Sequence, residues 1–297
     1  MRSDVAFDSH GALCRAWHYT PGDTSGARPC VVMAHGFGAT RDASLEPYAL
    51  RFAAAGMHVL LFDYRHFGAS EGEPRQLLDI ARQLEDWRAA VAFARSRPEL
   101  DAARVALWGT SFSGGHVLRI AAEDSRVAAV VSQVPFCDGR AGAASLRALL
   151  PLLGRALLDA AGARLGRAPV EIPVVGKPGA AAVLTTPDSE PGYLALVPPG
   201  SPWRNAVAAR VLLRVPRYRP GLDAARIGCP LLVCVAELDA VTPPAPALDA
   251  AARAPRGTAK LYPCRHFEVY RGPHFERAVA DQVAFLTEQL RPAAAGA

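Results

Sequence analysis

Several features that define common protein classes are missing from this sequence. No stretch reaches about 18 consecutive apolar residues, so the sequence predicts no membrane-spanning helix. Residues 1–7 contain no apolar core of the kind that a secretory signal peptide needs. We therefore expect a cytoplasmic protein.

The cysteines and the charges also lack the spacing that would mark a metal site or a nucleic-acid interface. The six cysteines are scattered, form no C-x-x-C pair and mostly lie in or beside apolar runs. We therefore expect buried free thiols, with neither a metal nor an organic cofactor. The formal net charge is +5, but the arginines that carry it are dispersed and form no basic tract. This pattern favours a solvated surface over nucleic-acid binding.

The sequence does contain short apolar runs that alternate with amphipathic segments. Continuous apolar runs predict buried strands at residues 29–34, 57–62, 105–108, 126–135, 229–236 and 259–262. Amphipathic segments predict helices at residues 45–55, 77–93, 114–118 and 275–290. Strands that alternate with helices imply a parallel sheet with right-handed crossovers. Two alternating runs predict an antiparallel hairpin at one sheet edge, at residues 5–8 and 13–19.

The regular alternation stops after residue 135. Residues 141–165 have a helical pattern with a predicted break at Pro151, residues 169–202 are rich in proline and glycine, and residues 203–215 suggest another helix. A stretch this long between two core strands is too long for a bare loop. We interpret it as a cap over the carboxyl edge of the sheet. The predicted division is a core in two parts, 1–135 and 228–297, with a cap insertion at 136–227.

The stretch that begins at Val105 carries the strongest chemical signal. The apolar run ends at Trp108, and Gly109-Thr-Ser-Phe-Ser113 joins it to a segment with helical spacing. A serine between small residues on a strand–turn–helix is the pattern of a nucleophile elbow, G-x-S-x-G, here with serine in the last position. Shifted by two residues, the same pattern makes Ser113 the nucleophile. We favour Ser111, because it lies two residues after Gly109, where the strand ends.

The motifs of this chain resemble those of the α/β-hydrolases, in the capped branch that includes dienelactone-hydrolase-like proteins, X-Pro-peptidase-like proteins and fungal polyketide transferases. The resemblance spans nearly the whole chain and rests on His35-Gly-Phe-Gly, Asp63-Tyr-Arg-x-x-Gly-x-Ser70, Gly109-Thr-Ser-Phe-Ser113, Asp239-x-x-Thr-Pro-Pro244 and His266-Phe-Glu-Val-Tyr270. It implies the α/β-hydrolase fold, with a mostly parallel sheet of about eight strands flanked by helices and a helical cap insertion.

The resemblance also implies roles for individual residues. In α/β-hydrolases the order along the chain is serine, acid, histidine, and Ser111, Asp239 and His266 follow that order. Phe37 and Phe112 are the candidates that donate backbone N–H groups to the oxyanion hole. We therefore predict that His266 takes the Ser111 proton as the serine attacks a carbonyl. An acyl-enzyme then forms, and water or another acceptor releases it.

Alternatives remain for the acid and for the base. Glu237 and Asp138 are rival acids, and Asp138 follows the strand where some α/β-hydrolases place theirs. His274 is a rival base, although it lies at the start of the last predicted helix. His116 is close to the nucleophile along the chain and is typical of a histidine packed in a helix. The remaining histidines have no catalytic context, namely His10, His18 and His58.

The leading hypothesis is a serine hydrolase for an ester, thioester or lactone of a medium-sized apolar acyl substrate, polyketide-like molecules included. The second is an acyltransferase or cyclase that uses the same triad. The third is a catalytically inactive binding protein on this fold, against which the complete set of candidate triad residues argues. The expected partner is a small acyl molecule and not a nucleic acid, and a homodimer is left open.

Overall fold

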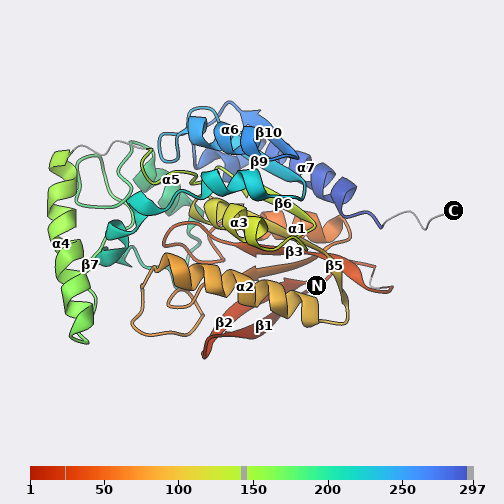
Figure 1. Cartoon of the computed structure of the whole chain (residues 1–297), viewed down its shortest axis with the longest axis horizontal. Coiled ribbons are helices and arrows are strands. Elements are labelled where there is room, and N and C mark those ends of the chain that lie inside the picture. The colour runs from red at the N-terminus through yellow and green to blue at the C-terminus, as the bar shows by residue number, and fades with distance from the viewer. Residues whose placement is uncertain (24, 142–145, 293–297) are drawn as a thin grey trace.

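The computed structural model describes residues 1–23, 25–141 and 146–292. Within this part of the chain, eight strands form one sheet in the order β1-β2-β4-β3-β5-β6-β9-β10 (Figure 1). Their bounds are β1 Arg2–Ser9, β2 Ala12–Tyr19, β3 Arg28–Ala34, β4 His58–Phe62, β5 Leu100–Thr110, β6 Ala129–Gln133, β9 Leu231–Ala236 and β10 Gly257–Tyr262. β2 runs antiparallel to both β1 and β4, and the other pairings in the sheet are parallel. The predicted mostly parallel sheet with an edge hairpin is confirmed.

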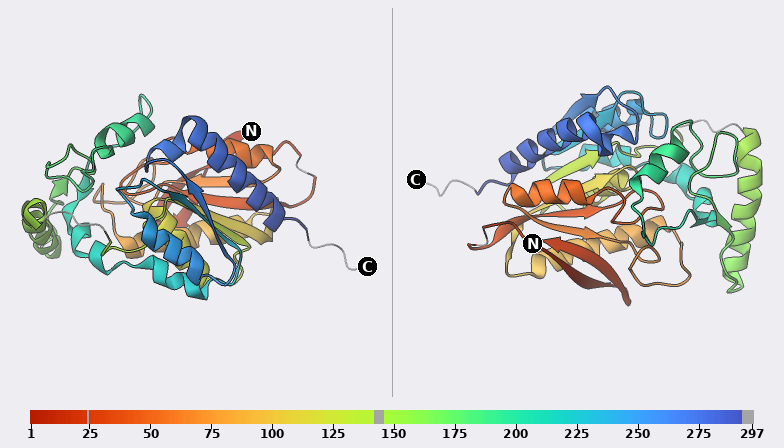
Figure 2. Two further views of the ribbon diagram at one scale, coloured as in Figure 1. Left: turned by 90° about the horizontal axis from the view of Figure 1, so that it is seen from above. Right: turned by 180° about the vertical axis from the view of Figure 1, so that it is seen from behind.

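The central strands are mostly apolar and deeply buried because helices cover both faces of the sheet. Every residue of β4, β6 and β9 is buried. One face is covered by α1 (Glu46–Ala54) and α7 (Gly272–Gln289), the other by α2 (Ile80–Ser96), α3 (Phe112–Glu123) and α6 (Pro244–Arg253) (Figure 2). A parallel strand between two helical layers has no solvent-facing side, so its residues need not alternate.

The cysteines lie in this core as free thiols, as the sequence predicts. All six are free, and five of them are buried while Cys229 is half-buried. Burial raises the pKa of the Cys30 thiol to about 12. Among the described residues, no helix has the length and apolar character that crossing a membrane requires.

Much of the segment between β6 and β9 lies beyond the sheet, on the side where the parallel strands end, and its last part runs back beside α3 and α6 (Figure 1). It contains α4 (Leu146–Arg164), α5 (Ser189–Leu196) and a small sheet of β7 (Glu171–Ile172) and β8 (Val207–Ala208). Three 3₁₀ helices lead back to the core, namely η1 (Ala209–Leu213), η2 (Val215–Arg217) and η3 (Pro220–Arg226). We call this segment, residues 136–227, the insertion. Its division from the core at these boundaries stays a prediction.

The structure corrects three predictions within the insertion. α4 continues through Pro151, although a proline beyond the first turn of a helix removes one backbone hydrogen bond. Residues 142–145 of the predicted helix lie outside the described residues. α5 occupies a stretch predicted to be irregular, and its Pro191 lies in the first turn, where backbone N–H groups have no intrahelical partner. In place of the helix predicted at residues 203–215, residues 207–213 form β8 and η1. Pairing with β7 and a hydrogen bond from the Ala208 N–H to the Gln76 carbonyl extend the backbone at β8.

Candidate active site

Ser111 lies on the turn between β5 and α3. Its backbone φ of 55° and ψ of −118° form a conformation that L-residues rarely adopt. The turn is held from outside, because the Ser111 N–H donates to the Gln133 carbonyl at 2.8 Å and the Phe136 N–H donates to the Ser111 carbonyl at 2.8 Å. A Cβ at Gly109 would lie 2.2 Å from the Ser113 carbonyl oxygen, so only glycine lets the helix pack this closely on the strand. The predicted strand–turn–helix is therefore present.

The side chains of Ser111, His266 and Asp239 form one hydrogen-bonded chain. His266 Nε2 is 3.1 Å from Ser111 Oγ, and His266 Nδ1 is 2.6 Å from Asp239 Oδ2. Asp239 follows β9 and His266 follows β10, so all three residues come from the carboxyl edge of the sheet. The His266 and Asp239 side chains are only 3% and 1% exposed. This arrangement can transfer a proton from the serine hydroxyl to the imidazole.

The environment of Asp239 keeps its carboxyl group ionised. The backbone N–H groups of Val241 and Thr242 each donate to Asp239 Oδ1 at 2.8 Å, and Thr242 Oγ1 donates to Oδ2 at 2.9 Å. Burial alone raises the pKa of Asp239, but the neighbouring His266 and the bonds from Thr242 outweigh it, so that the pKa lies below its usual value. An ionised carboxylate accepts the Nδ1–H of His266 and leaves Nε2 free to act as a base. Thr242 belongs to the motif Asp239-x-x-Thr-Pro-Pro244, but the sequence alone does not predict its hydrogen bonds to Asp239.

The two predicted oxyanion-hole donors belong to the loop after β3 and to the first turn of α3. The rings of Phe37 and Phe112 pack edge to face, with their centroids 5.3 Å apart. A Cβ at Gly36 would lie 3.0 Å from the Cβ of Ser111, so the loop passes directly against the serine. Within the described ranges, no backbone acceptor pairs with the N–H of Phe37 or Phe112. Both groups can therefore donate to a ligand.

The rival nucleophile and acids have other surroundings. Ser113 is fully buried, and its hydroxyl is hydrogen-bonded to the Tyr64 hydroxyl at 2.8 Å. Asp138 forms an ion pair with Arg219 at 2.9 Å. Glu237 is exposed to solvent. The contact with His266 thus belongs to Ser111 and Asp239.

The other histidines also have partners or positions of their own. His116 Nδ1 is 2.7 Å from the Tyr218 hydroxyl, and its Nε2 is 3.0 Å from Gln83 Oε1. Burial lowers the pKa of His116 to about 3, as for a neutral packed histidine. His18 and His58 contact each other at 2.9 Å. His274 lies in the first turn of α7, and His10 is exposed at the turn between β1 and β2.

A small cavity adjoins Ser111 and His266. Its volume is about 30 Å³. The walls are largely apolar and come from both the core and the insertion, including Ala43, Leu45, Leu184, Tyr193, Leu196 and Phe267. The space beside Ser111 is therefore small and largely apolar.

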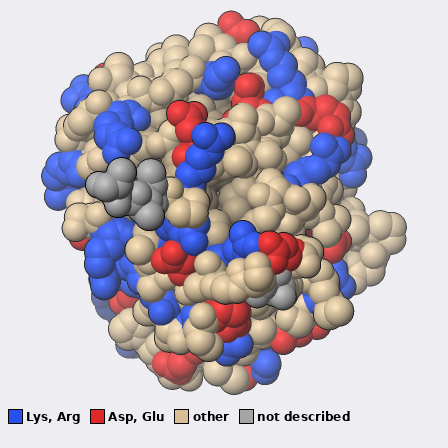
Figure 3. Space-filling view, turned by 90° about the vertical axis from the view of Figure 1, so that its right-hand side faces the viewer, with Lys and Arg blue, Asp and Glu red and all other residues tan. Residues whose placement is uncertain are grey.

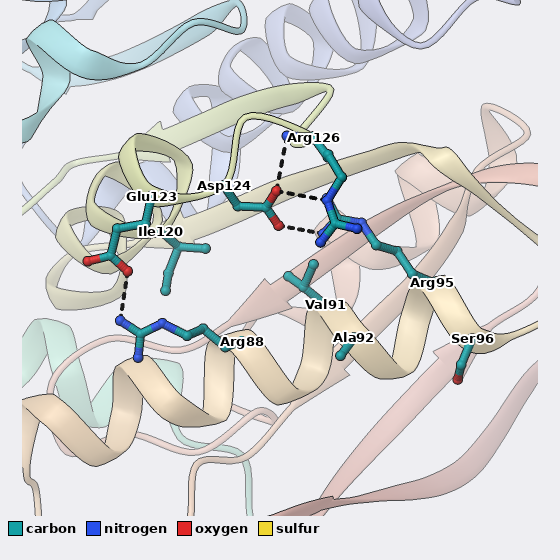
Figure 4. Close-up of a pocket in the computed structure, with 9 residues that line it drawn as sticks. All are labelled: Arg88, Val91, Ala92, Arg95, Ser96, Ile120, Glu123, Asp124 and Arg126. Carbon is teal, nitrogen blue, oxygen red and sulfur yellow. Dashed lines mark hydrogen bonds and ion pairs between the residues drawn. The ribbon is translucent and has the colours of Figure 1, made fainter.

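A larger groove, of about 550 Å³, lies between α2 and α3 (Figure 4). Its arginines face acids: Arg88 pairs with Glu123 at 2.7 Å, while Arg95 and Arg126 both pair with Asp124. No histidine lines the groove. Its three arginines all pair with the two acids, and because the groove lacks a histidine base beside a nucleophile, it offers no comparable chemistry.

The surface charges are interspersed on the face that lies opposite α4. Figure 3 shows lysine and arginine side chains next to aspartate and glutamate side chains across this face. Arg51 and Glu276, 2.8 Å apart, are one example of an exposed pair of opposite charges. Mixed charges of this kind are typical of a solvated surface.

Comparisons with known proteins agree with this fold. The family model described as serine aminopeptidase, S33, matches residues 25–171. The quorum-quenching protein AidA from Acinetobacter baumannii is 50% identical over 95% of this chain and 93% of its own length. The chain therefore belongs to the α/β-hydrolase family, and it is an α/β-hydrolase enzyme.

The predicted similarity to polyketide transferases is also confirmed. Polyketide transferase grgF from Penicillium sp is 35% identical over 60% of this chain and 59% of its own length. The crystal structure of the α/β-hydrolase GrgF from Penicillium sp. sh18 superimposes with a TM-score of 0.82 at 27% identity, covering 98% of this chain and 99% of that one. The fold class predicted from the sequence is thus the observed one.

Proposed function

We propose that this α/β-hydrolase is a serine hydrolase that works through Ser111, His266 and Asp239. The observation that carries the proposal is the hydrogen-bonded chain from Ser111 Oγ through both nitrogens of His266 to the carboxylate of Asp239. A serine hydroxyl is a weak nucleophile until a base accepts its proton, and the base needs a group that holds its tautomer. The strained backbone of Ser111 and the ionised state of Asp239 support the same assignment.

In the proposed reaction, Ser111 Oγ attacks the substrate carbonyl while its proton moves to His266 Nε2. The backbone N–H groups of Phe37 and Phe112 bind the oxyanion, and each such donor contributes about 3 kcal/mol of transition-state stabilisation. The leaving group takes the proton from His266 as the acyl-enzyme forms. Water then attacks the acyl-enzyme, again with His266 as the base, and the acid is released.

The proposed substrate is an ester, thioester or lactone of a medium-sized apolar acyl group. The apolar walls of the cavity support this class, although its volume of about 30 Å³ requires residues such as Leu184 and Leu196 to move before an acyl chain enters. The name of AidA, a quorum-quenching protein, supports a small-molecule substrate. In this proposal the insertion acts as the cap. The cytoplasmic location, the homodimer and the absence of nucleic-acid binding stay predictions.

The test is covalent labelling by a fluorophosphonate probe, read by intact mass. We expect wild type and Ser113→Ala to gain one probe mass and Ser111→Ala to gain none. Ser113→Ala is the matched control, because it removes a hydroxyl two residues away on the same turn. Labelling that disappears only in Ser113→Ala would move the nucleophile, and a folded wild type without label would contradict the proposal.

Acyl transfer to another acceptor is the second candidate function. The observation that favours it is the likeness to GrgF over 98% of this chain, together with the name polyketide transferase given to that relative. A transferase forms the same acyl-enzyme but releases it to an alcohol or amine. Product analysis with and without added acceptor, at constant acyl donor, separates the two functions. If only the free acid forms in every case, the second candidate is wrong.

A further inference from the structure

The loop that carries Phe37 has little conformational rigidity of its own. Phe37 lies between Gly36 and Gly38, and Gly38 has a φ of +60°. Because glycine accepts many backbone conformations, local sterics do not fix the direction in which the Phe37 N–H points. On the core side, His35 Nδ1 donates to the Gly36 carbonyl at 3.0 Å, which orients the peptide plane that contains the Phe37 N–H.

On its other side, the loop is held by two aromatic residues of the insertion. The Tyr193 hydroxyl, from α5, donates to the Phe37 carbonyl at 2.9 Å. The Trp203 indole N–H donates to the Gly38 carbonyl at 2.9 Å. The two rings also pack on each other, with their centroids 5.2 Å apart. The next two peptide planes of the loop are therefore oriented from outside the core.

The insertion packs tightly against this loop. A Cβ at Gly38 would lie 2.7 Å from Cγ2 of Val174, so there is no room for the loop to shift toward the insertion. Tyr193 is buried, and its ring centroid is 6.1 Å from that of Phe267, the residue next to His266. One side chain of the insertion thus contacts both the candidate oxyanion loop and the loop of the candidate base.

We propose that Tyr193 and Trp203 are positioning residues that aim the Phe37 N–H at the oxyanion. The inference rests on the proposed function, because it assigns these residues to the oxyanion hole of that reaction. A donor stabilises the transition state only at hydrogen-bond distance from the position that the oxyanion will occupy. Two hydrogen bonds to the carbonyls of Phe37 and Gly38 hold the loop in that position. The insertion thus completes the support of this donor, which His35 provides from the core side.

The test compares variants that each lose one hydrogen-bond donor. Tyr193→Phe and Trp203→Phe are measured with an apolar acyl ester such as p-nitrophenyl butyrate. We expect kcat to fall about tenfold in each, with KM changed less than about twofold, because a displaced donor weakens transition-state binding and leaves substrate binding intact. Tyr48→Phe is the matched control, since this buried hydroxyl also donates to a backbone carbonyl, that of Val269 at 2.6 Å. We expect Tyr48→Phe to keep the wild-type kcat.

A second readout separates positioning of the oxyanion loop from general damage. The pH profile of kcat/KM should stay unchanged in Tyr193→Phe, because its hydroxyl does not contact His266 or Asp239. An unchanged kcat in Tyr193→Phe, a loss entirely in KM, or a shifted pH profile would overturn the inference. The proposed function is not contradicted by any of these three results, provided that wild type hydrolyses the ester and Ser111→Ala does not. A wild type that is neither labelled nor active would overturn both.

Discussion

The core and the insertion are built in different ways. In the core, long parallel strands hydrogen-bond to one another and every residue of β4, β6 and β9 is buried. In the insertion, β7 and β8 have only two residues each. Buried polar side chains there accept hydrogen bonds from backbone N–H groups that longer strands would otherwise pair. Asp159 of α4, 1% exposed, accepts hydrogen bonds from the N–H groups of Val170 at 2.9 Å and Arg210 at 2.8 Å. A core of this kind can be predicted from local patterns, whereas the insertion depends on individual polar contacts.

The two regions also contribute different parts of the candidate site. The core supplies Ser111, Asp239 and His266, each at the end of a strand. The insertion supplies part of the cavity wall and the hydrogen bonds to the loop of Phe37. Substitutions in the core should therefore abolish activity or folding. Substitutions in the insertion should have smaller effects on activity and stability.

The largest difference should come from the two rival acids. We expect Asp239→Asn to lower kcat about 10⁴-fold, because the amide no longer holds His266 with Nε2 as the base. Asp138→Asn, at the start of the insertion, should lower kcat less than about twofold, since Asp138 pairs with Arg219 and not with His266. Steady-state ester hydrolysis measures both. Equal losses in the two variants would contradict the assignment of the acid.

A pair of glycines tests the packing of the two regions. Gly109→Ala should lower the free energy of unfolding by about 3 kcal/mol or more, because the added Cβ would lie 2.2 Å from the Ser113 carbonyl oxygen. Gly154→Ala should raise it by up to about 1 kcal/mol, since this glycine is inside α4 and nothing lies within 4 Å of the added Cβ. Urea unfolding monitored by circular dichroism checks both signs. Equal changes in the free energy of unfolding of the two variants would contradict the difference in packing between the core and the insertion.

The contact of His116 with Tyr218 joins the two regions and should make stability depend on pH. Burial lowers the pKa of His116 from 6.5 to about 3, so between these values the unfolded chain binds a proton that the folded chain does not. Stability is therefore complete above pH 6.5 and lost as the pH falls. His116 alone should lower the free energy of unfolding by about 2 kcal/mol between pH 6.5 and about pH 4.5. His58 and His66, whose pKa values burial also lowers to about 4, add to this loss in the same direction.

The matched variants for this pH dependence are His116→Gln and His10→Gln. His116→Gln has no titrating group at this position, so its stability should change less steeply with pH. His10→Gln is the control for the loss of a histidine side chain, because His10 is exposed at a turn. Denaturant unfolding at several pH values between 4.5 and 7 measures the slopes, with about 0.5 kcal/mol as the smallest difference worth interpreting. A wild-type slope in His116→Gln would show that other groups cause the acid sensitivity.

Much of the core and three of the candidate residues could be predicted because their signals are local. Apolar runs predict buried strands wherever both faces of a sheet are covered, and Gly109-Thr-Ser-Phe-Ser113 predicts the turn because only small residues fit there. The order of Ser111, Asp239 and His266 along the chain was enough to nominate a triad. In the insertion, Pro151 and the proline and glycine content of residues 169–202 misled the prediction. α4 continues through Pro151, and Pro191 lies in the first turn of α5, where no intrahelical hydrogen bond is lost.

The remaining features depend on groups that are far apart in the sequence and meet only after folding. The hydrogen bond of Ser113 to Tyr64 and that of His266 to Asp239 distinguish the candidate residues from their rivals. Tyr193 and Phe37 are 156 residues apart, and no local pattern predicts that the hydroxyl of one meets the carbonyl of the other. Sequence periodicity reports which face of an element is buried. The particular donor and acceptor that meet across two packed regions depend on the positions of both chain segments in space.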